Sequence, residues 1–314
     1  MVLKSLPELP IPSDTVVQRL ETADGVGLRA ARWPARVRPV QGTVCLFQGR
    51  GEQIEKYLPV VEALRDRGFA VATFDWRGQG GSDRLAAVPL GHVNDFRDYQ
   101  RDIEAFRRTM VLPDCPGPHY ALAHSMGGNI LLEAAPKLAP WIRRLVLSAP
   151  FLDFGAIPVS RTTVRRLALG FKLAGLGRAA IPGPTRKLAV VRDFEDNPLT
   201  SDPEQFRIMT SLTRVYPELW LGAPTNGWMY AAAAAMDRLD ADDFPATVPL
   251  PVMLINCGAD RLVSVAANER MARRLRSIAY VLVPGSRHEI LFEAPAYAAQ
   301  FWAAFDSFVP GSRD

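Results

Sequence analysis

Residues 120–130 read YALAHSMGGNI, and this stretch decides the fold. The apolar run YALAH predicts a strand, the residues from Asn129 onward predict a helix, and Ser125 lies in the turn between them. A sharp strand-to-helix turn lifts a serine Oγ to the end of a sheet and directs a helix N-terminus at it, so Ser125 is a candidate nucleophile. The tight turn requires small residues two before and two after the serine, and Ala123 and Gly127 meet that requirement.

Strand-like runs alternate with helical patterns on both sides of this turn. Strands are predicted at 43–47, 69–74, 120–124, 144–149, 251–257 and 279–284, and helices at 54–67, 96–110, 129–138, 265–276 and at the end of the chain to about residue 308. This rhythm predicts an α/β fold with a mostly parallel central sheet and helices on both faces. Residues 154–247 contain helical stretches without a clear strand. We therefore expect a core formed by residues 1–153 and 248–314, with a helical cap at 154–247 inserted after the sixth strand.

Composition excludes several classes of protein. With 314 residues, 48% of them hydrophobic and 22% charged, the chain has the balance of a folded protein rather than a disordered one. The net charge is only +4, and no basic run is interleaved with aromatic residues, so nucleic acid is not an expected partner. Cys45, Cys115 and Cys257 are odd in number and lack metal-ligand spacing, which favours a reducing compartment. The N-terminal residues lack a signal-peptide pattern, so the sequence predicts a cytoplasmic protein.

A serine nucleophile needs a base, and histidine usually fills that role because its pKa lies near neutral pH. Four histidines are available. His288 follows the last predicted strand at the carboxyl edge of the sheet, where sites of open α/β sheets form, and is the expected base. His119 begins a buried strand and His92 lies in a polar stretch. His124 is adjacent to Ser125, where we expect the turn to send its side chain to a different side.

The expected acid is Asp260, in the loop after the strand at 251–257. It gives the chain order Ser125, Asp260, His288, which is the order of an α/β-hydrolase triad. Asp260 would fix the tautomer of the imidazole and stabilise the imidazolium. Asp153, after the preceding strand, is the reserve candidate, and Asp75 is more easily explained as a turn-stabilising residue.

Acyl transfer also needs two backbone N–H donors for the oxyanion. One is expected from Met126, directly after the nucleophile. The other is expected from the Arg50 amide, in the loop after the strand at 43–47. Gly49 and Gly51 flank Arg50 and would let this loop approach the serine closely, although a plain glycine turn before a helix is the alternative explanation.

The near-neutral net charge hides a polarised cap. Residues 154–192 contain eight basic residues and no acidic one, namely Arg161, Arg165, Arg166, Lys172, Arg178, Arg186, Lys187 and Arg192. Residues 193–247 contain ten acidic residues and three basic ones. Val164, Leu167, Phe171 and Ala174 form one apolar stripe beside the basic face, and we expect that stripe to rest on the core. The alternative is an interfacial element that meets anionic lipid, with a peripheral position at the inner membrane surface.

Taken together, these residues resemble the α/β-hydrolase superfamily, and more narrowly its lysophospholipase and monoacylglycerol lipase-like serine hydrolases. The resemblance rests on FQGRGEQIEKY (47–57), FDWRGQGGSDR (74–84), GHVNDFRDYQRD (91–102), AHSMGGNI (123–130), NPLTSDPEQF (197–206), GADRLV (258–263) and PGSRHE (284–289). It implies that the insertion is a lid over an acyl pocket and that neither a metal nor an organic cofactor is needed. Gln48 departs from the family pattern, in which many relatives carry histidine at the start of the oxyanion loop.

The resemblance implies an esterase that releases a fatty acid from a monoacyl lipid, either a lysophospholipid or a monoacylglycerol, through an acyl-enzyme. One alternative on the same fold is an aminopeptidase like the proline iminopeptidases, which would need cap carboxylates directed at a substrate amine. A second alternative is a non-catalytic ligand-binding protein on a hydrolase scaffold. The intact set of Ser125, Asp260 and His288 disfavours that second alternative.

Overall fold

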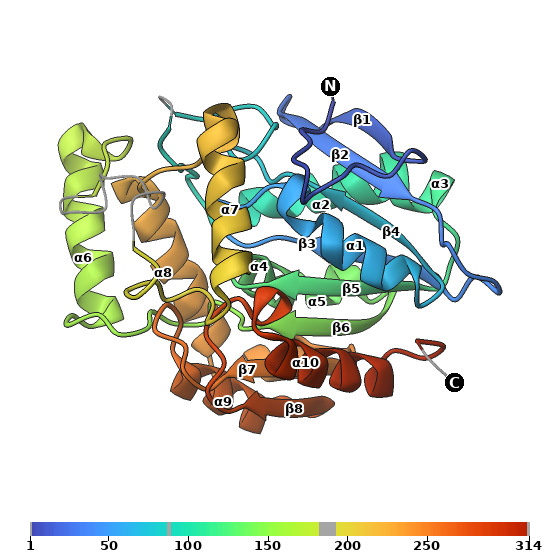
Figure 1. The fold of residues 1–314 in the computed structure, drawn as a ribbon. Coiled ribbons are helices and arrows are strands. Elements are labelled where there is room, and N and C mark those ends of the chain that lie inside the picture. The colour runs from blue at the N-terminus through green and yellow to red at the C-terminus, as the bar shows by residue number, and fades with distance from the viewer. Residues whose placement is uncertain (1, 87–88, 182–192, 313–314) are drawn as a thin grey trace.

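A twisted eight-stranded sheet runs through the molecule, with helices on both faces (Figure 1). The computed structural model describes residues 2–86, 89–181 and 193–312. The strands are β1 (Val16–Glu21), β2 (Gly27–Trp33), β3 (Gly42–Phe47), β4 (Phe69–Phe74), β5 (His119–His124), β6 (Ile142–Ser148), β7 (Val252–Cys257) and β8 (Ile278–Val283). Their order across the sheet is β1-β2-β4-β3-β5-β6-β7-β8. β2 pairs antiparallel with β1 and β4, and the other neighbours are parallel.

Two hydrophobic cores lie on the two faces of this sheet. Helices α1 (Leu58–Arg65) and α10 (Pro295–Phe308) cover one face, while α2 (Tyr99–Phe106), α4 (Met126–Glu133) and α9 (Val265–Arg274) cover the other. The short helices are η1 (Ile54–Tyr57), η2 (Phe96–Asp98), η3 (Arg107–Val111), α3 (Leu112–Asp114), α5 (Ala135–Leu138) and η9 (Ile290–Phe292). Because both faces are covered, the central strands β3 and β4 are buried along their whole length. The α/β class and the mostly parallel sheet are confirmed.

The sequence analysis predicted β3 to β8 and did not predict β1 and β2. These two strands lack the continuous apolar run of the central strands, since β1 lies at an edge and β2 carries two arginines. Arg29 of β2 is nonetheless buried, because Glu55 and Asp75 both pair with its guanidinium. The available signal was Asp24-Gly25, a hairpin-type dipeptide whose glycine has φ +79°.

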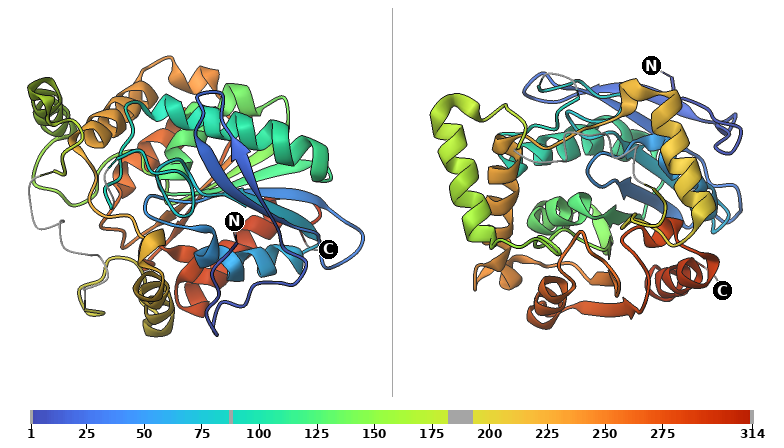
Figure 2. Two further views of the ribbon diagram at one scale, coloured as in Figure 1. Left: turned by 90° about the horizontal axis from the view of Figure 1, so that it is seen from above. Right: turned by 60° about the vertical axis from the view of Figure 1, so that its left-hand side comes forward.

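The segment between β6 and β7 forms the cap. Its helices are α6 (Arg161–Phe171), η4 (Lys172–Leu176), α7 (Pro203–Val215), η7 (Pro217–Leu219), α8 (Asn226–Asp240) and η8 (Phe244–Thr247). Within the described part of this segment, every regular element apart from isolated bridges is helical. Figure 2 shows α6 and α8 side by side at one end of the sheet. In the described residues, no helix of the chain is long and apolar enough to cross a membrane.

The expected packing of the α6 stripe is wrong. Leu167 is 58% exposed, and Ala174 is exposed as well. α6 instead packs on α8 through Ala168, which is buried. The face of α6 that contacts α8 lies beside the apolar stripe, because carboxylates of α8 pair with two arginines of α6 on that face.

Salt bridges between the two helices account for part of the charge polarity of the cap. Asp237 of α8 accepts Arg161 at 3.0 Å and Arg165 at 2.6 Å, and Arg161 also pairs with Asp240. The basic first part and the acidic second part of the cap therefore neutralise each other where α6 meets α8. Arg186, Lys187 and Arg192 lie outside the described residues.

Candidate active site

Ser125 occupies a strained turn between β5 and α4. Its φ of 48° and ψ of −114° are unusual for a residue with a side chain, and such strain is typical of a nucleophile at a strand-to-helix turn. The amide of Ser125 donates to Ser148 O at 3.0 Å, and its carbonyl accepts Phe151 N at 2.9 Å, so β6 and the residues after it hold the turn. A Cβ at Gly127 would lie 2.7 Å from Gln48 O, so only glycine lets the first turn of α4 approach the end of β3 this closely.

Ser125, His288 and Asp260 form one hydrogen-bonded row. His288 Nε2 lies 3.0 Å from Ser125 Oγ, and His288 Nδ1 lies 2.6 Å from Asp260 Oδ2. The other Asp260 oxygen accepts the amides of Leu262 at 2.7 Å and Val263 at 3.0 Å, which fixes the carboxylate plane. Burial disfavours the imidazolium, but the attraction and hydrogen bond of Asp260 prevail and raise the pKa of His288 above its usual 6.5. The carboxylate is thus oriented to hold the imidazole in the tautomer that can accept a proton at Nε2.

The loop that carries His288 is held by a cap segment. The Glu289 amide donates to Leu199 O at 2.9 Å, and the Arg287 guanidinium donates to Thr200 O at 2.9 Å. The Arg287 amide in turn donates to the buried Glu293 carboxylate at 2.7 Å. The NPLTSD stretch at 197–202 therefore positions the histidine loop as well as belonging to the cap.

The backbone amides of residues 49–51, in the loop after β3, differ in their hydrogen-bond acceptors. Gly49 N–H donates to the Glu52 carboxylate, and Gly51 N–H donates to Gln79 Oε1 at 2.5 Å. The Arg50 amide has no acceptor among the described residues. Of the three, only the Arg50 N–H is therefore available to a ligand, and the amide of Met126, in the first turn of α4, has no intrahelical acceptor either.

Gln48 is buried where many relatives of the resembled family carry histidine. Its backbone oxygen accepts Trp76 Nε1 at 2.9 Å, and its side-chain Nε2 lies 3.4 Å from Thr73 Oγ1. Its Oε1 has no partner among the described residues. The side chain thus supports the loop from behind, away from the row of Ser125 and His288.

Two further histidines have structural partners. His92 Nδ1 lies 2.8 Å from Thr225 Oγ1 and joins a core loop to the start of α8. His119 Nε2 lies 3.2 Å from the Cys115 carbonyl. Neither bonds to Ser125, and among the four histidines, all of which the structure describes, His288 is the one within hydrogen-bond distance of the serine hydroxyl.

The two other aspartates considered as the acid of the triad bond to other groups. Asp75 accepts the Ile54 amide at 2.9 Å and the Gly81 amide at 2.8 Å, which stabilises two turns. Asp153 accepts its neighbouring amide and lies 3.4 Å from Arg161 of the cap. Neither carboxylate bonds to His288.

His124 does not turn away from the site, contrary to the sequence-based expectation. Its ring centroid lies 4.7 Å from that of His288. Alternation along β5 places His124 on the same face as Leu122, which is the face covered by α1 and α10, and the loop after β8 packs down on that face. Complete burial lowers the pKa of His124 to about 3, so this imidazole is neutral.

A buried ionic cluster lies behind the two histidines. Lys56 Nζ bonds to Glu52 and lies 2.8 Å from Glu289 Oε1, while the other Glu289 oxygen lies 3.4 Å from His124 Nε2. Tyr57 donates to Glu52 at 2.7 Å. Burial opposes the charge of Lys56, but the two carboxylates raise its pKa. The grouping of Glu52, His124 and Glu289 resembles a metal site, yet the Lys56 ammonium already supplies the cation between the carboxylates.

Sequence reasoning missed this cluster. Glu52 and Lys56 stand four residues apart, the spacing of a helical ion pair, and Glu289 directly follows the expected base. These were the available signals. Nothing in the sequence alone indicates that three such groups from two distant segments meet in the interior.

A cavity of about 380 Å³ opens over Ser125 and His288. Its wall is mainly apolar, and the cap and the β7–α9 loop supply much of it, through Phe154, Leu199, Pro224, Trp228, Met229, Leu262 and Val263. Met126 and Arg50 also reach it. A concave apolar site with a few polar groups at its base is the usual form of a small-molecule site.

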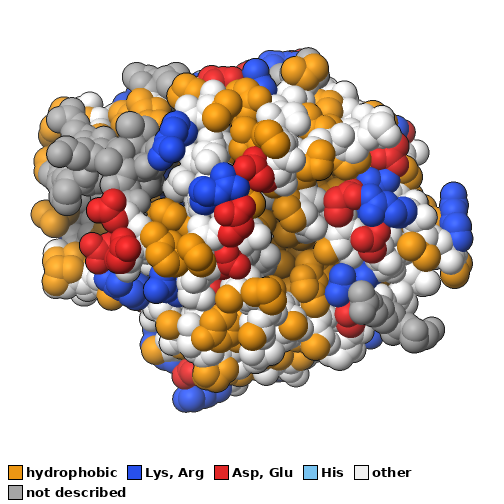
Figure 3. Space-filling model, viewed as in Figure 1, with side chains coloured by type: hydrophobic (Ala, Val, Ile, Leu, Met, Phe, Trp, Pro, Cys, Tyr) orange, Lys and Arg blue, Asp and Glu red, His pale blue; other side chains and the backbone are white. Residues whose placement is uncertain are grey.

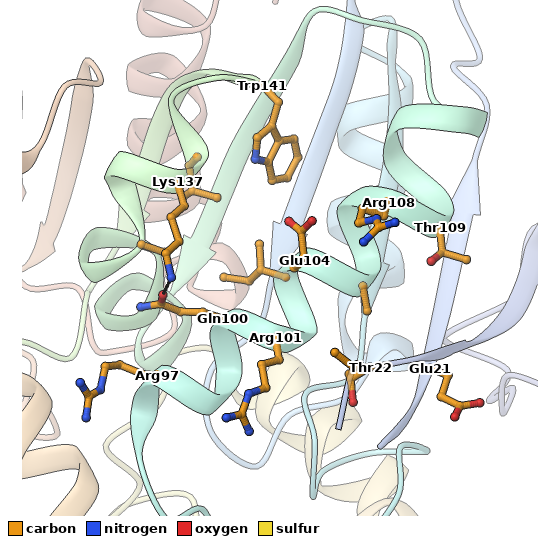
Figure 4. A pocket seen from close by; sticks show the side chains of 15 residues that line it. Glu21, Thr22, Arg97, Gln100, Arg101, Glu104, Arg108, Thr109, Lys137 and Trp141 are labelled. Atoms are coloured by element: carbon orange, nitrogen blue, oxygen red, sulfur yellow. Dashed lines mark hydrogen bonds between the residues drawn. The ribbon is translucent and has the colours of Figure 1, made fainter. Parts of the chain in front are cut away.

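A larger cavity, of about 1070 Å³, lies elsewhere on the surface. Figure 4 shows its lining from α2 and its neighbours, including Arg97, Arg101 and Lys137. Three of its cations have their own partners, since Arg97 pairs with Asp95, Arg101 pairs with Asp24 and Lys137 donates to a glutamine. No residue of the hydrogen-bonded row lines it, whereas Ser125 and His288 line the smaller cavity, which is therefore the candidate active site.

Comparisons with known proteins agree that this chain is similar to a group of hydrolases. Residues 38–295 match the family model described as serine aminopeptidase, S33. Lysophospholipase L2 of Escherichia coli K12 is 31% identical over 291 residues, which cover 87% of this chain and 81% of that protein. Monoglyceride lipase of Mus musculus is 29% identical over 249 residues, which cover 77% of this chain and 73% of that protein.

Solved structures agree with the fold. A monoglyceride lipase from Saccharomyces cerevisiae, solved with a substrate analog, superposes with a TM-score of 0.73 at 19% identity and covers 96% of this chain and 98% of its own. The monoacylglycerol lipase of Paleococcus ferrophilus gives a TM-score of 0.69 at 22% identity, with 91% and 99% covered. At these identities the likeness extends to the α/β-hydrolase fold.

Proposed function

This chain belongs to the serine aminopeptidase S33 family of α/β-hydrolases and is similar to lysophospholipases and monoglyceride lipases, and we propose that it hydrolyses monoacyl lipid esters to a fatty acid. The observation that carries the proposal is the row of Ser125, His288 and Asp260 at the base of an apolar cavity. The row supplies a nucleophile and its base, and the cavity supplies apolar surface for an acyl chain.

In the proposed reaction Ser125 Oγ attacks the ester carbonyl while His288 Nε2 takes its proton. His288 then gives that proton to the leaving alcohol, and the acyl-enzyme is hydrolysed by water with His288 again as the base. Asp260 orients His288 and stabilises the imidazolium without taking the proton. The raised pKa of His288 favours the imidazolium that each step forms.

The Met126 and Arg50 amides are the proposed oxyanion donors. Both residues line the cavity, and of the three amides from Gly49 to Gly51 the Arg50 N–H is the one without an acceptor among the described residues. Gly49 and Gly51 support the loop, because their own amides are tied to side chains. We keep residues 154–247 as the proposed bounds of the cap over this site.

Peptide hydrolysis is less well supported, despite the family's name. An aminopeptidase needs a free carboxylate to receive the substrate ammonium. Glu52 and Glu289 line the cavity, but both are bonded to Lys56. The described lining therefore offers a substrate amine no uncommitted carboxylate.

Release of fatty acid from monoolein, lysophosphatidylcholine and a series of nitrophenyl esters tests the proposal, with Ser125→Ala as the inactive control. We expect turnover of the long-chain substrates and labelling of Ser125 by a fluorophosphonate. A preference for acetyl or butyryl esters that collapses beyond about eight carbons would contradict an acyl pocket of this volume. Absence of labelling would revive the non-catalytic alternative.

We further propose that the tip of the cap contacts lipid surfaces. Leu167, Leu173 and Leu176 are 58%, 79% and 47% exposed beside Lys172, a pattern typical of interfacial helices. Hydrophobic side chains lie along this edge, over α6, in Figure 3. Because Arg165 is already paired with Asp237, contact would depend more on these leucines than on that arginine.

Sedimentation with vesicles containing phosphatidylglycerol tests this contact. The double variant Leu173→Ser plus Leu176→Ser should bind the vesicles several-fold less. Val37→Ser alters an exposed residue outside the cap and should bind them as the wild type does. Equal binding of all three proteins would contradict contact through the cap tip.

A further inference from the structure

Arg50 lines the active-site cavity, and its guanidinium has no carboxylate partner among the described residues. The residue lines the same cavity as Ser125 and His288. Its side chain reaches the cap, where Nη2 donates to Gly222 O and Cζ lies 5.1 Å from the centre of the Trp228 ring. Its Nε is fully enclosed and has no hydrogen-bond partner among the described residues. Arg50 is thus the one charged residue of the oxyanion loop without a counter-ion among the described residues, and it belongs to the lining of the substrate cavity.

Two other enclosed arginines of this protein have carboxylate partners. Arg29 pairs with Glu55 and Asp75, and Arg77 pairs with Asp24 and Asp102. Both of these arginines have raised pKa values, even though burial opposes their charge. Arg50 therefore differs from these two arginines because it lacks a carboxylate partner, and not because it is buried.

The charge of Arg50 is left uncompensated. Burial lowers the pKa of Arg50 to about 10, and no described carboxylate lies within ion-pair distance. The internal residues outside the description, 87–88 and 182–192, contain no Asp or Glu. A guanidinium without a counter-ion costs free energy unless a ligand supplies the anion.

We infer that Arg50 is a specificity-determining residue that binds the phosphodiester of a lysophospholipid headgroup. This inference rests on the proposed esterase function and names the substrate class within it. The planar guanidinium donates in a fork that matches two phosphate oxygens, and such charge-assisted bonds are stronger than neutral ones. The Trp228 face keeps the cation in place between turnovers. A monoacylglycerol lacks the anion and leaves Arg50 uncompensated.

The position of Arg50 fits this role. Its own amide is the proposed oxyanion donor, so the side chain begins beside the ester carbonyl and extends toward Gly91 and the cap. The apolar residues Phe154, Met229 and Val263 leave the rest of the cavity to the acyl chain. The phosphate is joined to the ester through the glycerol carbons, so a bound lysophospholipid would reach Arg50 from the serine.

The test compares two substrates with one acyl chain, decanoyl-lysophosphatidylglycerol and monodecanoylglycerol, both below their critical micelle concentrations. Arg50→Gln should lower the ratio of their kcat/KM values by about 10- to 100-fold, the factor for losing one or two charge-assisted hydrogen bonds. Arg50→Lys keeps the charge but not the fork and should lower it less. A ratio unchanged within about twofold in Arg50→Gln would overturn the inference.

Arg84→Gln is the matched control. Arg84 also joins a core loop to the cap, donating to Gly78 O at 2.7 Å and Glu218 O at 2.6 Å, and burial also lowers its pKa. It does not line the catalytic cavity. Its substitution should leave the substrate ratio unchanged, and an equal fall in both variants would show that any cap contact has this effect, which contradicts a headgroup site at Arg50.

A measurement on the wild-type protein keeps the inference testable if Arg50 variants do not fold. Glycerophosphoglycerol, the deacylated product, should inhibit monodecanoylglycerol hydrolysis competitively, while glycerol should not. Inorganic phosphate at the same concentration should inhibit more weakly, and equal inhibition would indicate a site for free anions instead. No inhibition by the product would contradict the inference. Failure to hydrolyse either lipid would contradict the proposed function itself, which is a separate outcome.

Discussion

Two imidazoles lie 4.7 Å apart in this protein and have opposite protonation behaviour. The pKa of His288 is raised, whereas the pKa of His124 falls to about 3. Both rings are buried and both face a carboxylate. Burial acts to lower both pKa values, and the difference lies in the neighbouring charges, because Asp260 attracts a proton to His288 while His288 and Lys56 repel a proton on His124. Among the described residues Asp260 accepts only backbone amides besides His288, so its charge remains available, while Glu289 is already paired with Lys56. A carboxylate raises the pKa of a histidine only as far as its charge is not already compensated.

The largest expected effect comes from removing the charge of Asp260. Asp260→Asn should lower kcat by about 10⁴-fold, because the amide no longer fixes the reactive tautomer or stabilises the imidazolium. His288 would then lack an uncompensated carboxylate, as His124 does. Steady-state hydrolysis of a nitrophenyl ester measures the loss. Asp153→Asn is the control, and a loss of similar size there would instead favour Asp153 as the acid.

The second effect is on stability and concerns the cluster around His124. Lys56→Met should destabilise the fold by about 3–5 kcal/mol, since it leaves Glu52 and Glu289 buried without a cation. Urea unfolding followed by tryptophan fluorescence measures the change. Lys137→Met alters a lysine that bonds only to a surface glutamine and should stay within about 0.5 kcal/mol of the wild type. A small effect at Lys56 would mean that the carboxylates become protonated or hydrated at little cost.

The two histidines also separate what sequence can predict from what it cannot. The six strands β3 to β8 could be predicted because central parallel strands are continuous apolar runs. The grouping of Ser125, Asp260 and His288 could be predicted because each follows a strand, and the carboxyl ends of parallel strands meet at one edge. Local pattern and sheet topology therefore supply most of the fold and the row of three residues.

What could not be predicted depends on contacts between distant segments. The position of His124 beside His288 depends on how the loop after β8 packs, and the role of Lys56 depends on two carboxylates separated in the chain by more than two hundred residues. The face that α6 turns to α8 depends on Asp237, which no periodicity in α6 reveals. In the last two cases charge pairing between distant segments, rather than the local apolar pattern, decides the arrangement.

A third prediction follows from the low pKa of His124. Above pH 6.5 both the folded and the unfolded chain carry a neutral imidazole, so the residue adds no pH dependence there. Below pH 6.5 the unfolded chain takes up a proton that the folded protein refuses, so the free energy of unfolding falls by up to about 1.4 kcal/mol per pH unit. His124→Gln lacks this loss. The difference in free energy of unfolding between wild type and variant, measured by urea unfolding, should therefore change by about 2 kcal/mol between pH 6.5 and pH 5. The comparison at pH 7.5 is the internal control, and parallel curves throughout would contradict a depressed pKa.

The smallest expected effect tests whether the ionic cluster beside His124 changes the pKa of His288. Glu289 touches His124 and also adds to the raised pKa of His288. In the wild type, kcat/KM should rise through an inflection above pH 6.5, because only the neutral His288 can accept the serine proton. Glu289→Gln removes one of the attracting charges, so the inflection should move to lower pH with its plateau reduced far less than in Asp260→Asn. Glu293→Gln alters another buried carboxylate, which bonds to Ser201 and the Arg287 amide instead, and should leave the inflection in place. An inflection unmoved by Glu289→Gln would mean that Lys56 cancels its charge completely, so that the ionic cluster sets stability and only Asp260 sets the basicity of His288.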